Sequence, residues 1–313
     1  MPRVQHRSWF VLTTLAAIAC ADVAGLERVS LRPAGDGGGG TSTMAGSTGT
    51  SVGAGGTGGM GTTTTTVATT GAGGGGGGGG GASACAYRQE ILADAPLAYW
   101  RLGETSSAIA ADETGSYPGA YLDAPTLGVP GAISCSPDTA VMLDGNDQFI
   151  DFGDHLAFTG TSAFSVEAWI RPAVIDGQDR YIVSRRTPSN PELIGWGLFI
   201  GPTGINFRRF FGGGQRDAAF FDPQLGSSPN FVHVVGTYDG ATMRLYVEGS
   251  LVDTIASSTS IPAASASLLI GRPHPTALED HYAGDVDEVA IYGAALPLER
   301  VVAHHQARMS GGR

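Results

Sequence analysis

A series of short apolar segments, each closed by glycine, proline or an Asp-Gly pair, constrains the fold of this chain more than any other feature. The clearest segment is FSVEAWIR, residues 164–171, in which every second residue up to Ile170 is apolar. Successive side chains of a strand point to opposite faces, so this alternation predicts a strand with one wholly apolar face. The second face carries Trp169, which indicates a central strand covered on both sides.

Further segments of this kind follow one another along the chain. They span 97–102, 141–152 with an internal Asp-Gly turn, 181–185, 196–200, 205–210, 231–238, 243–247, 251–255 and 268–272. Asp239-Gly240 and Glu248-Gly249 separate three of them, which predicts two successive hairpins in an antiparallel meander. Roughly a dozen short strands with no helical crossover between them predict an all-β fold, a β-sandwich or jelly roll.

Residues 284–301, GDVDEVAIYGAALPLERV, have the pattern of a strand followed by a short C-terminal helix. Valine, isoleucine and tyrosine favour a strand in the first half, and Pro297 is typical of the first turn of a helix. Asp285, Asp287 and Glu288 are interleaved with the apolar residues. We expect a closing strand and a cap on the core, and the alternative is that a carboxylate of this segment holds a cation.

A glycine-rich stretch limits how much of the chain can fold. Residues 35–81 hold 23 of the 49 glycines, and no charged residue occurs between Asp36 and Arg88. Such a stretch has almost nothing to bury, so we expect it to be disordered. We therefore expect one folded domain (85–313) after a disordered Gly/Thr-rich linker (21–84). The first residues (1–20) are expected to be an export signal, for the reasons given next.

The first twenty residues have the composition of an export signal, because Arg3 and Arg7 precede an apolar run that ends in small residues before Cys20. The sequence LAAIAC, residues 15–20, resembles a bacterial lipobox, with Ala17 where that motif usually has leucine. Two alternatives stay open, acylation on Cys20 and ordinary signal cleavage nearby. No other segment reaches the roughly 18 apolar residues of a spanning helix, so we expect membrane attachment only through an N-terminal lipid anchor.

An exported protein that uses its first cysteine for an anchor retains an even pair, Cys85 and Cys135, for which a disulfide is the default expectation. The bridge would close a loop of about 50 residues and contribute roughly 3 to 4 kcal/mol through the unfolded state. These features predict a location in the bacterial cell envelope, at the outer membrane or the cell surface.

The charge of the domain excludes one class of partner. Of 18 basic and 29 acidic side chains in the chain, 14 and 26 lie in residues 85–313, and every basic residue is an arginine. An acidic domain without a basic run is a poor ligand for nucleic acid, whose binding depends on neutralised phosphates. We therefore expect no nucleic-acid partner.

Catalytic patterns are missing from residues 85–313, which contain no GxSxG, HExxH or GxxxxGK[ST] sequence. Retaining glycosidases need two carboxyl groups about 5 Å apart. Asp285 and Asp287 would share a face with no acid two residues on, and Glu288 would point the other way. Glu167 stands alone on its strand. We predict no catalytic residues.

The histidines are expected to be structural or solvated. His304 and His305 are adjacent on the terminal helix and would face different ways, which favours a solvated pair at the surface. His233 lies in the middle of a strand and is expected to be a satisfied sheet residue.

Two stretches are candidates for ligand binding. The first is an aromatic and cationic patch around Gly212–Gly214, and the second is a loop between two strands. Aromatic faces stack on sugar rings, and arginine forks suit carboxylates or sulfates. Burial of the aromatic residues in the core is the alternative. The candidate residues are Arg208, Arg209, Phe210, Phe211 and Arg216 in the patch, and His274, His281 and Tyr282 in the loop.

Five blocks in order also carry a family likeness: AYWRLGE (98–104), LDGNDQF (143–149), FSVEAWI (164–170), HVVGTYD with LYVEG (233–249) and GDVDEVAIY (284–292). Together they resemble the concanavalin A-like lectin/glucanase superfamily, and its laminin G-like, pentraxin-related bacterial domains most closely. The likeness covers nearly all of residues 85–302. It implies an antiparallel jelly-roll sandwich of two curved sheets, with ligands bound on the concave face or at the loop edge.

The resemblance also implies a metal and a function. Members of the superfamily often hold structural calcium, and by resemblance its ligands would be Asp287 with Glu104 or Asp112. The implied function is non-catalytic binding of carbohydrate or of a surface protein. Two alternatives stay open, a glycoside hydrolase of the same superfamily with an unrecognised carboxylate pair, and a purely structural or adhesive envelope protein.

Overall fold

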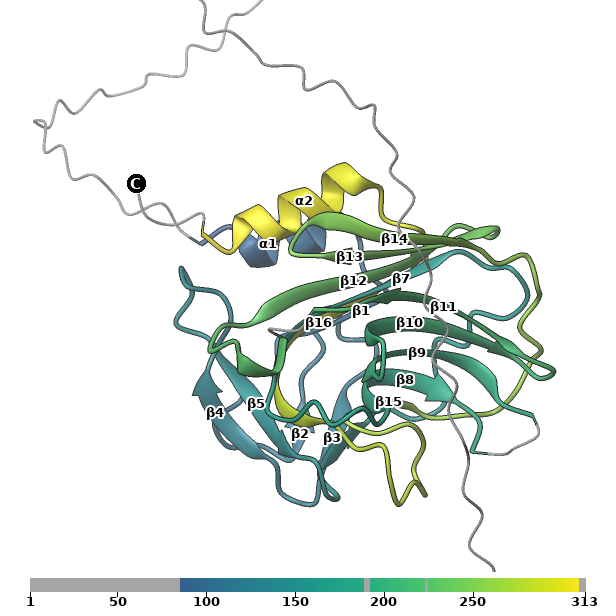
Figure 1. Cartoon of the computed structure of the whole chain (residues 1–313). Helices are drawn as coiled ribbons and strands as arrows, with labels where there is room; N and C mark the ends of the chain where they lie inside the picture. The colour runs from purple at the N-terminus through teal and green to yellow at the C-terminus, as the bar shows by residue number, and fades with distance from the viewer. Residues whose placement is uncertain (1–84, 189–191, 223–224, 310–313) are drawn as a thin grey trace, which may run out of the picture. The chain divides into compact units, whose positions relative to one another are not determined.

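Two antiparallel sheets of eight strands each form the part of the chain described by the structure, a computed structural model that covers residues 85–188, 192–222 and 225–309 (Figure 1). The predicted all-β jelly-roll sandwich with a short C-terminal helix is confirmed. The expected export signal, the acylated Cys20 and the Gly/Thr-rich linker lie outside the described residues.

The first sheet, sheet A, has the order β14-β13-β12-β7-β16-β5-β4, and β1 pairs with β16. Its strands are β1 (Ala98–Trp100), β4 (Thr126–Pro130), β5 (Thr139–Asp144), β7 (Phe164–Pro172), β12 (Val232–Tyr238), β13 (Thr242–Val247), β14 (Ser250–Ala256) and β16 (Ala283–Tyr292).

The second sheet, sheet B, has the order β11-β10-β9-β8-β15-β6-β3-β2. Its strands are β2 (Ile109–Ala110), β3 (Gly119–Leu122), β6 (Phe149–Asp151), β8 (Arg180–Arg186), β9 (Ile194–Gly201), β10 (Gly204–Phe211), β11 (Gln215–Phe220) and β15 (Leu268–Ile270). The helices are α1 (Tyr87–Ala93) and α2 (Leu298–Ala307), with a 3-10 turn at Leu225–Ser227.

The turn chemistry of the sequence explains most of this topology. β12, β13 and β14 form the predicted meander, with consecutive antiparallel pairing. The Asp144-Gly145 turn joins β5 to β6, but these strands lie in different sheets, because β5 pairs with β16 and β6 pairs with β15 and β3. This turn is therefore a crossover between the sheets rather than a hairpin.

The inner faces of the two sheets enclose the main core. Phe164 of β7 packs against Trp196 and Phe207 of sheet B, with ring centroids 5.3 and 5.6 Å apart. A Cβ atom on Gly236 of β12 would lie 2.5 Å from the Phe207 ring, so glycine is needed there for the sheets to approach. The expected apolar face of the strand at 164–170 is thus the inner face of sheet A.

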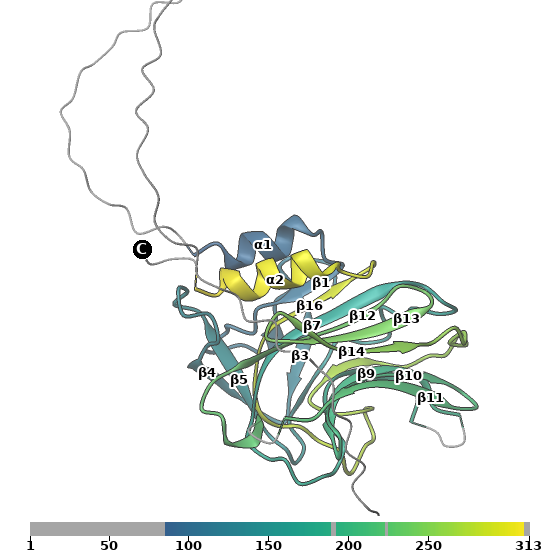
Figure 2. The ribbon, with the colours of Figure 1, turned by 45° about the horizontal axis from the view of Figure 1, so that its top comes forward.

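The outer face of sheet A is covered as well, by α1 and α2 (Figure 2). Trp169 of β7 is fully buried there, and Tyr87 of α1 and Val301 of α2 belong to the same apolar cluster. The indole Nε1 of Trp169 donates to the Tyr87 hydroxyl at 2.7 Å. The prediction of a central strand covered on both sides is confirmed.

Glu167 lies on this outer face of β7, completely buried, among donors from four other elements. His233 of β12 donates through Nε2 at 2.7 Å, and His304 of α2 donates through Nδ1 at 2.9 Å. The hydroxyls of Tyr292 on β16 and Tyr87 on α1 donate at 3.0 and 3.4 Å. One carboxylate therefore connects three strands and both helices.

The expectation of a solvated histidine pair is wrong for His304, which is fully buried. Its Nδ1 faces Glu167, and its Nε2 faces Asp94 at 2.8 Å. Ionised carboxylates only accept, so both ring nitrogens carry protons and the ring is a cation. His305 is half-buried and contacts Glu248 at 3.1 Å. The prediction failed because the spacing of histidines on a short helix does not reveal a buried acid on the sheet below.

We name Glu167 and its four partners, His233, His304, Tyr292 and Tyr87, the Glu167 cluster. In this cluster, charge and hydrogen bonding shift the pKa values more than burial does. Burial alone would raise the pKa of Glu167, but the charge of His304 and the hydrogen bonds from both histidines hold it well below its usual range. Burial alone would lower the pKa of His304, but Glu167 and Asp94 raise it. The Glu167 cluster is therefore an internal ion pair that locks α2 onto sheet A.

A β-bulge in β16 changes the faces expected for its acids. The register against β7 shifts between Asp287 and Ala290, and Glu288 has a φ of 50°. Val286 and Val289 both belong to the inner core although they are three residues apart, which requires one extra residue between them. Glu288 was expected to face away from Asp287, but it lies with the outer-face groups, where it accepts hydrogen bonds from Arg101.

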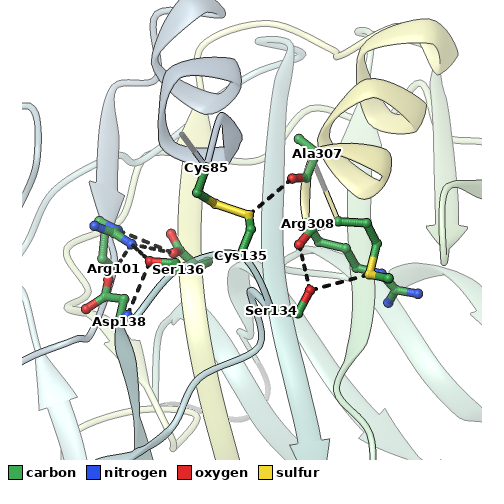
Figure 3. Close-up of a disulfide and its surroundings, with 10 residues drawn as sticks. Cys85, Arg101, Ser134, Cys135, Ser136, Asp138, Ala307 and Arg308 are labelled. Carbon is green, nitrogen blue, oxygen red and sulfur yellow. Dashed lines mark hydrogen bonds and ion pairs between the residues drawn. A yellow bond between two sulfur atoms is a disulfide. The ribbon is translucent and has the colours of Figure 1, made fainter. Parts of the chain in front are cut away.

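The predicted disulfide is confirmed between Cys85 and Cys135, whose Cα atoms are 5.2 Å apart (Figure 3). It ties Cys85, two residues before α1, to the loop between β4 and β5. The same loop contacts the end of α2, since Ser134 Oγ donates to the carbonyl of Arg308 at 3.1 Å. A loop of this length gives about 4 kcal/mol of stabilisation through the unfolded state.

Replacing Glu167 by glutamine should lower the free energy of unfolding by about 3 to 5 kcal/mol, because the buried charge of His304 would lose one of its two carboxylates. Urea unfolding at pH 7 followed by tryptophan fluorescence measures this loss. Glu299→Gln, at an exposed position of α2, removes the same charge and should change stability by less than about 0.5 kcal/mol. Equal stabilities of the two variants would contradict the role of Glu167.

The contribution of His304 should fall as the pH rises. Its pKa is raised in the folded protein, so its stabilisation is complete below the unfolded value of about 6.5 and is lost as the pH passes the folded value. The stability difference between the protein and His304→Gln should thus shrink from pH 6 to pH 9.

The control for that measurement is the neighbouring histidine. Burial lowers the pKa of His305, so the difference between the protein and His305→Gln should instead grow as the pH rises from about 5 to 7. A His304 difference that grew in the same way would show that its ring is not an imidazolium.

Candidate functional site

The predicted aromatic and cationic patch is divided between two environments. Arg208 lies on the outer face of sheet B, whereas Arg209, the next residue of β10, is fully buried against the core ring of Tyr238, 3.7 Å from its centroid. Phe210 is 1% exposed. Only Arg216 of the patch is exposed, and Phe211 is half-buried.

Arg209 is held as a structural cation. Its guanidinium donates to the hydroxyl of Ser257 at 2.7 Å and to carbonyl oxygens of Ser257, Gly160 and Thr259 at 3.1 to 3.3 Å. These bonds join β10 to two loops. The expectation that Arg209 and Phe210 belong to a surface patch is therefore wrong, because strand alternation and packing place both side chains out of contact with solvent.

Arg208 is committed to neighbouring acids. Its Nε and Nη2 donate to the two oxygens of Asp217 at 2.6 and 2.8 Å, and its Nη1 donates to Asp179 at 3.0 Å. The ring of Phe199 lies below the guanidinium, 4.4 Å from its carbon. A ligand would have to displace one of these carboxylates to bind Arg208.

The second predicted stretch, the loop from β15 to β16, holds two of its candidates inside. His281 is 4% exposed and Tyr282 is 1% exposed. The Nδ1 of His281 donates to the carbonyl of Asn146 in the β5–β6 turn, and its Nε2 accepts from Arg272 Nη2 at 3.1 Å. Burial, then Arg272 and Arg180, lower the pKa of this ring, which agrees with a neutral tautomer that bridges the two segments.

Two adjoining hollows border this loop at the edge of the sandwich. One has a volume of about 510 Å³ and the other about 300 Å³, and both are lined by residues 278–280. We name the pair the loop-edge hollow. The larger part is lined by Gly145, Asn146, Gln178, Arg180, Leu278, Glu279, Asp280 and His281, and the smaller part adds Pro273, His274, Thr276 and Ala277.

Donors and acceptors of both charges converge on the loop-edge hollow. Arg180 forms an ion pair with Asp176 and donates to the carbonyl of His281 at 3.1 Å. Burial and the nearby Asp179 raise the pKa of Asp280. Leu278 adds an apolar surface that is 94% exposed. Polar groups of both kinds beside an apolar surface suit a ligand rich in hydroxyls.

Several lining residues were not identified from the sequence. Asn146 and Gln178 come from the β5–β6 turn and the β7–β8 loop, far from Leu278 in the chain. The only sequence signal was the Asp-Gly pair at 144–145, which predicts a turn but not its neighbours. The hollow exists because β5, β7 and β16 are adjacent in sheet A, and their connections meet at one end.

Among the predicted calcium ligands, Asp287 is the one whose surroundings fit a cation. It is 1% exposed, its Oδ2 accepts from the amide of Ala132 at 2.7 Å, and its Oδ1 has no hydrogen-bond partner. Gly131 leaves room here, since a Cβ on it would lie 2.6 Å from the carbonyl oxygen of Asp138 and 3.1 Å from Oδ2 of Asp287. Burial, then Glu288 and Asp138, raise the pKa of Asp287.

The other two predicted ligands have protein partners. Glu104 accepts from the amide of Ala111 and the hydroxyl of Tyr121, each at 2.7 Å. Asp112 accepts from four main-chain amides, those of Tyr99, Thr114, Ser116 and Tyr117, at 2.8 to 3.0 Å. Over residues 85–188, 192–222 and 225–309, no three histidine, cysteine, aspartate or glutamate side chains gather as a metal site.

Another hollow, of about 550 Å³, lies on the outer side of sheet A near the end of α2. Its two arginines are neutralised, because Arg171 pairs with Asp285 and Arg308 pairs with Glu248. Asn230 also lines it. In the part of the chain that the structure describes, no helix has the length and apolar character needed to cross a membrane.

The antiparallel two-sheet jelly roll agrees with the class of concanavalin A-like lectins and glucanases. The family model described as the concanavalin A-like lectin/glucanases superfamily, Laminin_G_3, matches residues 144–302, about half of the chain. The chain belongs to this family. No protein of curated function matches the sequence.

Solved structures with this fold are mostly binding domains. The binding domain of Paraclostridial Mosquitocidal Protein 1 superposes with a TM-score of 0.53 and 17% identity, over 66% of this chain and 51% of that one. A second similar structure is domain 4 of AbnA, a GH43 extracellular arabinanase from Geobacillus stearothermophilus, in complex with arabinotriose. It superposes with a TM-score of 0.50 and 18% identity, over 67% of this chain and 98% of that one.

The binding domain of botulinum neurotoxin DC in complex with SialylT gives a TM-score of 0.53 and 14% identity, over 71% of this chain and 55% of that one. The chain thus spans about half the length of the mosquitocidal and neurotoxin chains. At these identities the likenesses establish the fold.

Proposed function

We propose that the domain binds carbohydrate, without cleaving it, at the loop-edge hollow. The observation that carries this proposal is the convergence of amide, guanidinium and carboxyl groups beside the exposed Leu278. The complexes of arabinanase domain 4 with arabinotriose and of the neurotoxin binding domain with SialylT support carbohydrate binding, because both chains superpose on this fold and were solved with a sugar. A protein carried on a cell surface is the alternative partner.

The environment of the acids supports a non-catalytic role. Glu167, Asp287 and Glu288 are at most 1% exposed and are engaged by histidines, an amide or an arginine. The acids of the hollow itself, Glu279 and Asp280, are consecutive residues of one loop. Glycoside hydrolysis needs two carboxyl groups facing each other across the scissile bond.

The cellular setting that we propose is the bacterial cell envelope. A basic and apolar N-terminus ending at Cys20 supports export with a lipid anchor, and the Gly/Thr-rich segment 21–84 supports a tether of considerable reach. The Cys85–Cys135 disulfide agrees with an oxidising compartment. Calcium, held by Asp287 and main-chain carbonyls, is the proposed structural ion.

Glycan binding should be seen when the whole protein is applied to a glycan array. Replacing Asn146 and Gln178 together by alanine should weaken binding about tenfold or more, because each lost hydrogen bond costs roughly 0.5 to 1.5 kcal/mol. Asn230→Ala, in the hollow near α2, is the matched control and should bind normally. An array silent with and without chelator would contradict carbohydrate binding, and released sugar would favour a hydrolase.

Calcium should raise the thermal midpoint of the whole protein, and a chelator should lower it. At a free concentration one hundred times the Kd, binding adds about 2.7 kcal/mol to the stability. Asp287→Asn should abolish this response without further loss of stability in chelator, because it removes a buried carboxylate whose Oδ1 lacks a partner. A midpoint that does not change on chelation would contradict the calcium proposal.

A further inference from the structure

Arg186, the last residue of β8, is a buried cation with an almost unused guanidinium. It is 7% exposed, and it forms no ion pair with a carboxylate of the described residues. Its Nη1 donates to the carbonyl of the next residue, Thr187, at 3.3 Å. Its Nε is buried and has no partner. Leaving a buried charge and a buried donor unpaired costs free energy, so an added hydrogen-bond acceptor would stabilise the guanidinium of Arg186.

Aromatic rings account for the position of Arg186 but not for its donors. The guanidinium carbon lies 5.0 Å from the ring centroid of Tyr181 and 5.8 Å from that of Phe210. A cation over aromatic faces is stabilised through the plane of the guanidinium. The N–H groups point out from the edge of that plane, so ring contacts leave them available for a ligand.

The buried Arg209 uses more of its donors than Arg186 does, although its Nε also lacks a partner. It also has no carboxylate partner among the described residues, but its guanidinium donates to Ser257, Gly160 and Thr259 through four hydrogen bonds. Arg186 has one such bond. Of the buried arginines that lack a carboxylate partner among the described residues, Arg186 therefore forms the fewest hydrogen bonds, one against three for Arg272 and four for Arg209.

The loop after β15 lies beside β8, since the hydroxyl of Ser184, two residues before Arg186, donates to the carbonyl oxygens of Arg272 and Pro273 at 2.7 and 3.1 Å. The side chain of Arg272 adds to the positive potential there. Burial, then the charges of Arg186, Arg272 and His281, lower the pKa of His274 to about 4. Arg272 is 8% exposed and donates only to neutral acceptors, the carbonyls of Pro275 and Ala277 and the ring of His281. His274 lines the smaller part of the loop-edge hollow, so this potential borders the proposed glycan site.

One acid lies close enough to affect this potential. The charge of Arg186 acts on Asp280, but the two side chains form no ion pair, and burial and Asp179 raise the pKa of Asp280. Glu279 is exposed in the same loop. These acids line the hollow itself, whereas Arg186 and Arg272 adjoin it at His274, on which both of their charges act.

We propose that Arg186, together with His274 and Arg272, binds the oxyanion of an acidic sugar, a carboxylate or a sulfate group. The sugar ring and its hydroxyls would occupy the loop-edge hollow. A planar fork with free donors matches both anions, which have oxygens at similar spacing. This inference rests on the proposed glycan function and names the class of glycan.

The experiment compares matched sugars on the whole protein by calorimetry: glucose, glucuronate and glucose 6-sulfate at one ionic strength. We expect at least one anionic sugar to bind tenfold or more tightly than glucose. Arg186→Gln should remove that preference. Arg216→Gln is the control, since Arg216 is exposed and also donates to an adjacent carbonyl, that of Gln215, so it removes the same charge and should keep the preference.

The outcomes separate the two proposals. Equal affinity for the three sugars, or a preference that survives in Arg186→Gln, would overturn the oxyanion site while leaving glycan binding intact. Binding of no sugar, on the array or by calorimetry, would overturn both. If Arg186→Gln melts early, Arg186→Lys keeps the charge but loses the fork, and it should lower the preference for the anion without abolishing it. The sugar that responds, carboxylated or sulfated, identifies the anion.

Discussion

The buried carboxylate of Glu167 is the constraint on which the arrangement of this domain depends. An ionised group in a dry interior is tolerated only when its lone pairs are filled, and here His233, His304 and Tyr292 fill them at 2.7 to 3.0 Å. These partners come from two strands and the C-terminal helix. The order of the sheet and the docking of the helix are therefore specified together, because any other packing would leave the buried charge of Glu167 without hydrogen-bond partners.

The same constraint decides which surfaces remain for a ligand. With α1 and α2 held over sheet A by the Glu167 cluster and by the disulfide, the outer face of that sheet is closed. In the part of the chain that the structure describes, no α-helix packs on sheet B as α1 and α2 pack on sheet A, and the connections of β5, β7 and β16 meet at one end of the sandwich. The loop-edge hollow thus depends on the position of central strands that are buried on both faces, which gives the loops a rigid support.

The sequence predicted what local alternation and turn chemistry encode. The strand at 164–172, the meander of β12 to β14 and the proline before α2 follow from period-two patterning, glycine turns and a fixed φ. The prediction of surface exposure was wrong for Arg209 and His304, which are both buried. Alternation assigns a side chain to a face, but it does not say whether that face is covered, and the partners of His304 lie more than 130 residues away.

The bulge at Glu288 was missed for a related reason. One extra residue in a strand moves every later side chain to the opposite face of the sheet. The sequence DEVAIY is compatible with a strand with or without that extra residue. The sequence analysis named part of the candidate site, because it offered His274, His281 and Tyr282 as candidates in a loop between two strands. Gln178 and Asn146 were not identified, because only the three-dimensional order of the strands brings their loops together.

An acidic domain can bind an anionic sugar if its overall negative charge is screened by salt while one cation in contact with the ligand is not. Residues 85–313 carry 26 acidic and 14 basic side chains, so the long-range field repels anions. At physiological ionic strength exposed charges act over only about 8 Å, whereas a desolvated guanidinium at contact is hardly screened. Arg186 is 7% exposed and lies near two aromatic rings, so its guanidinium is desolvated in this sense. Association with an acidic glycan should therefore be slow and short-ranged, and its selectivity should come from the contact itself.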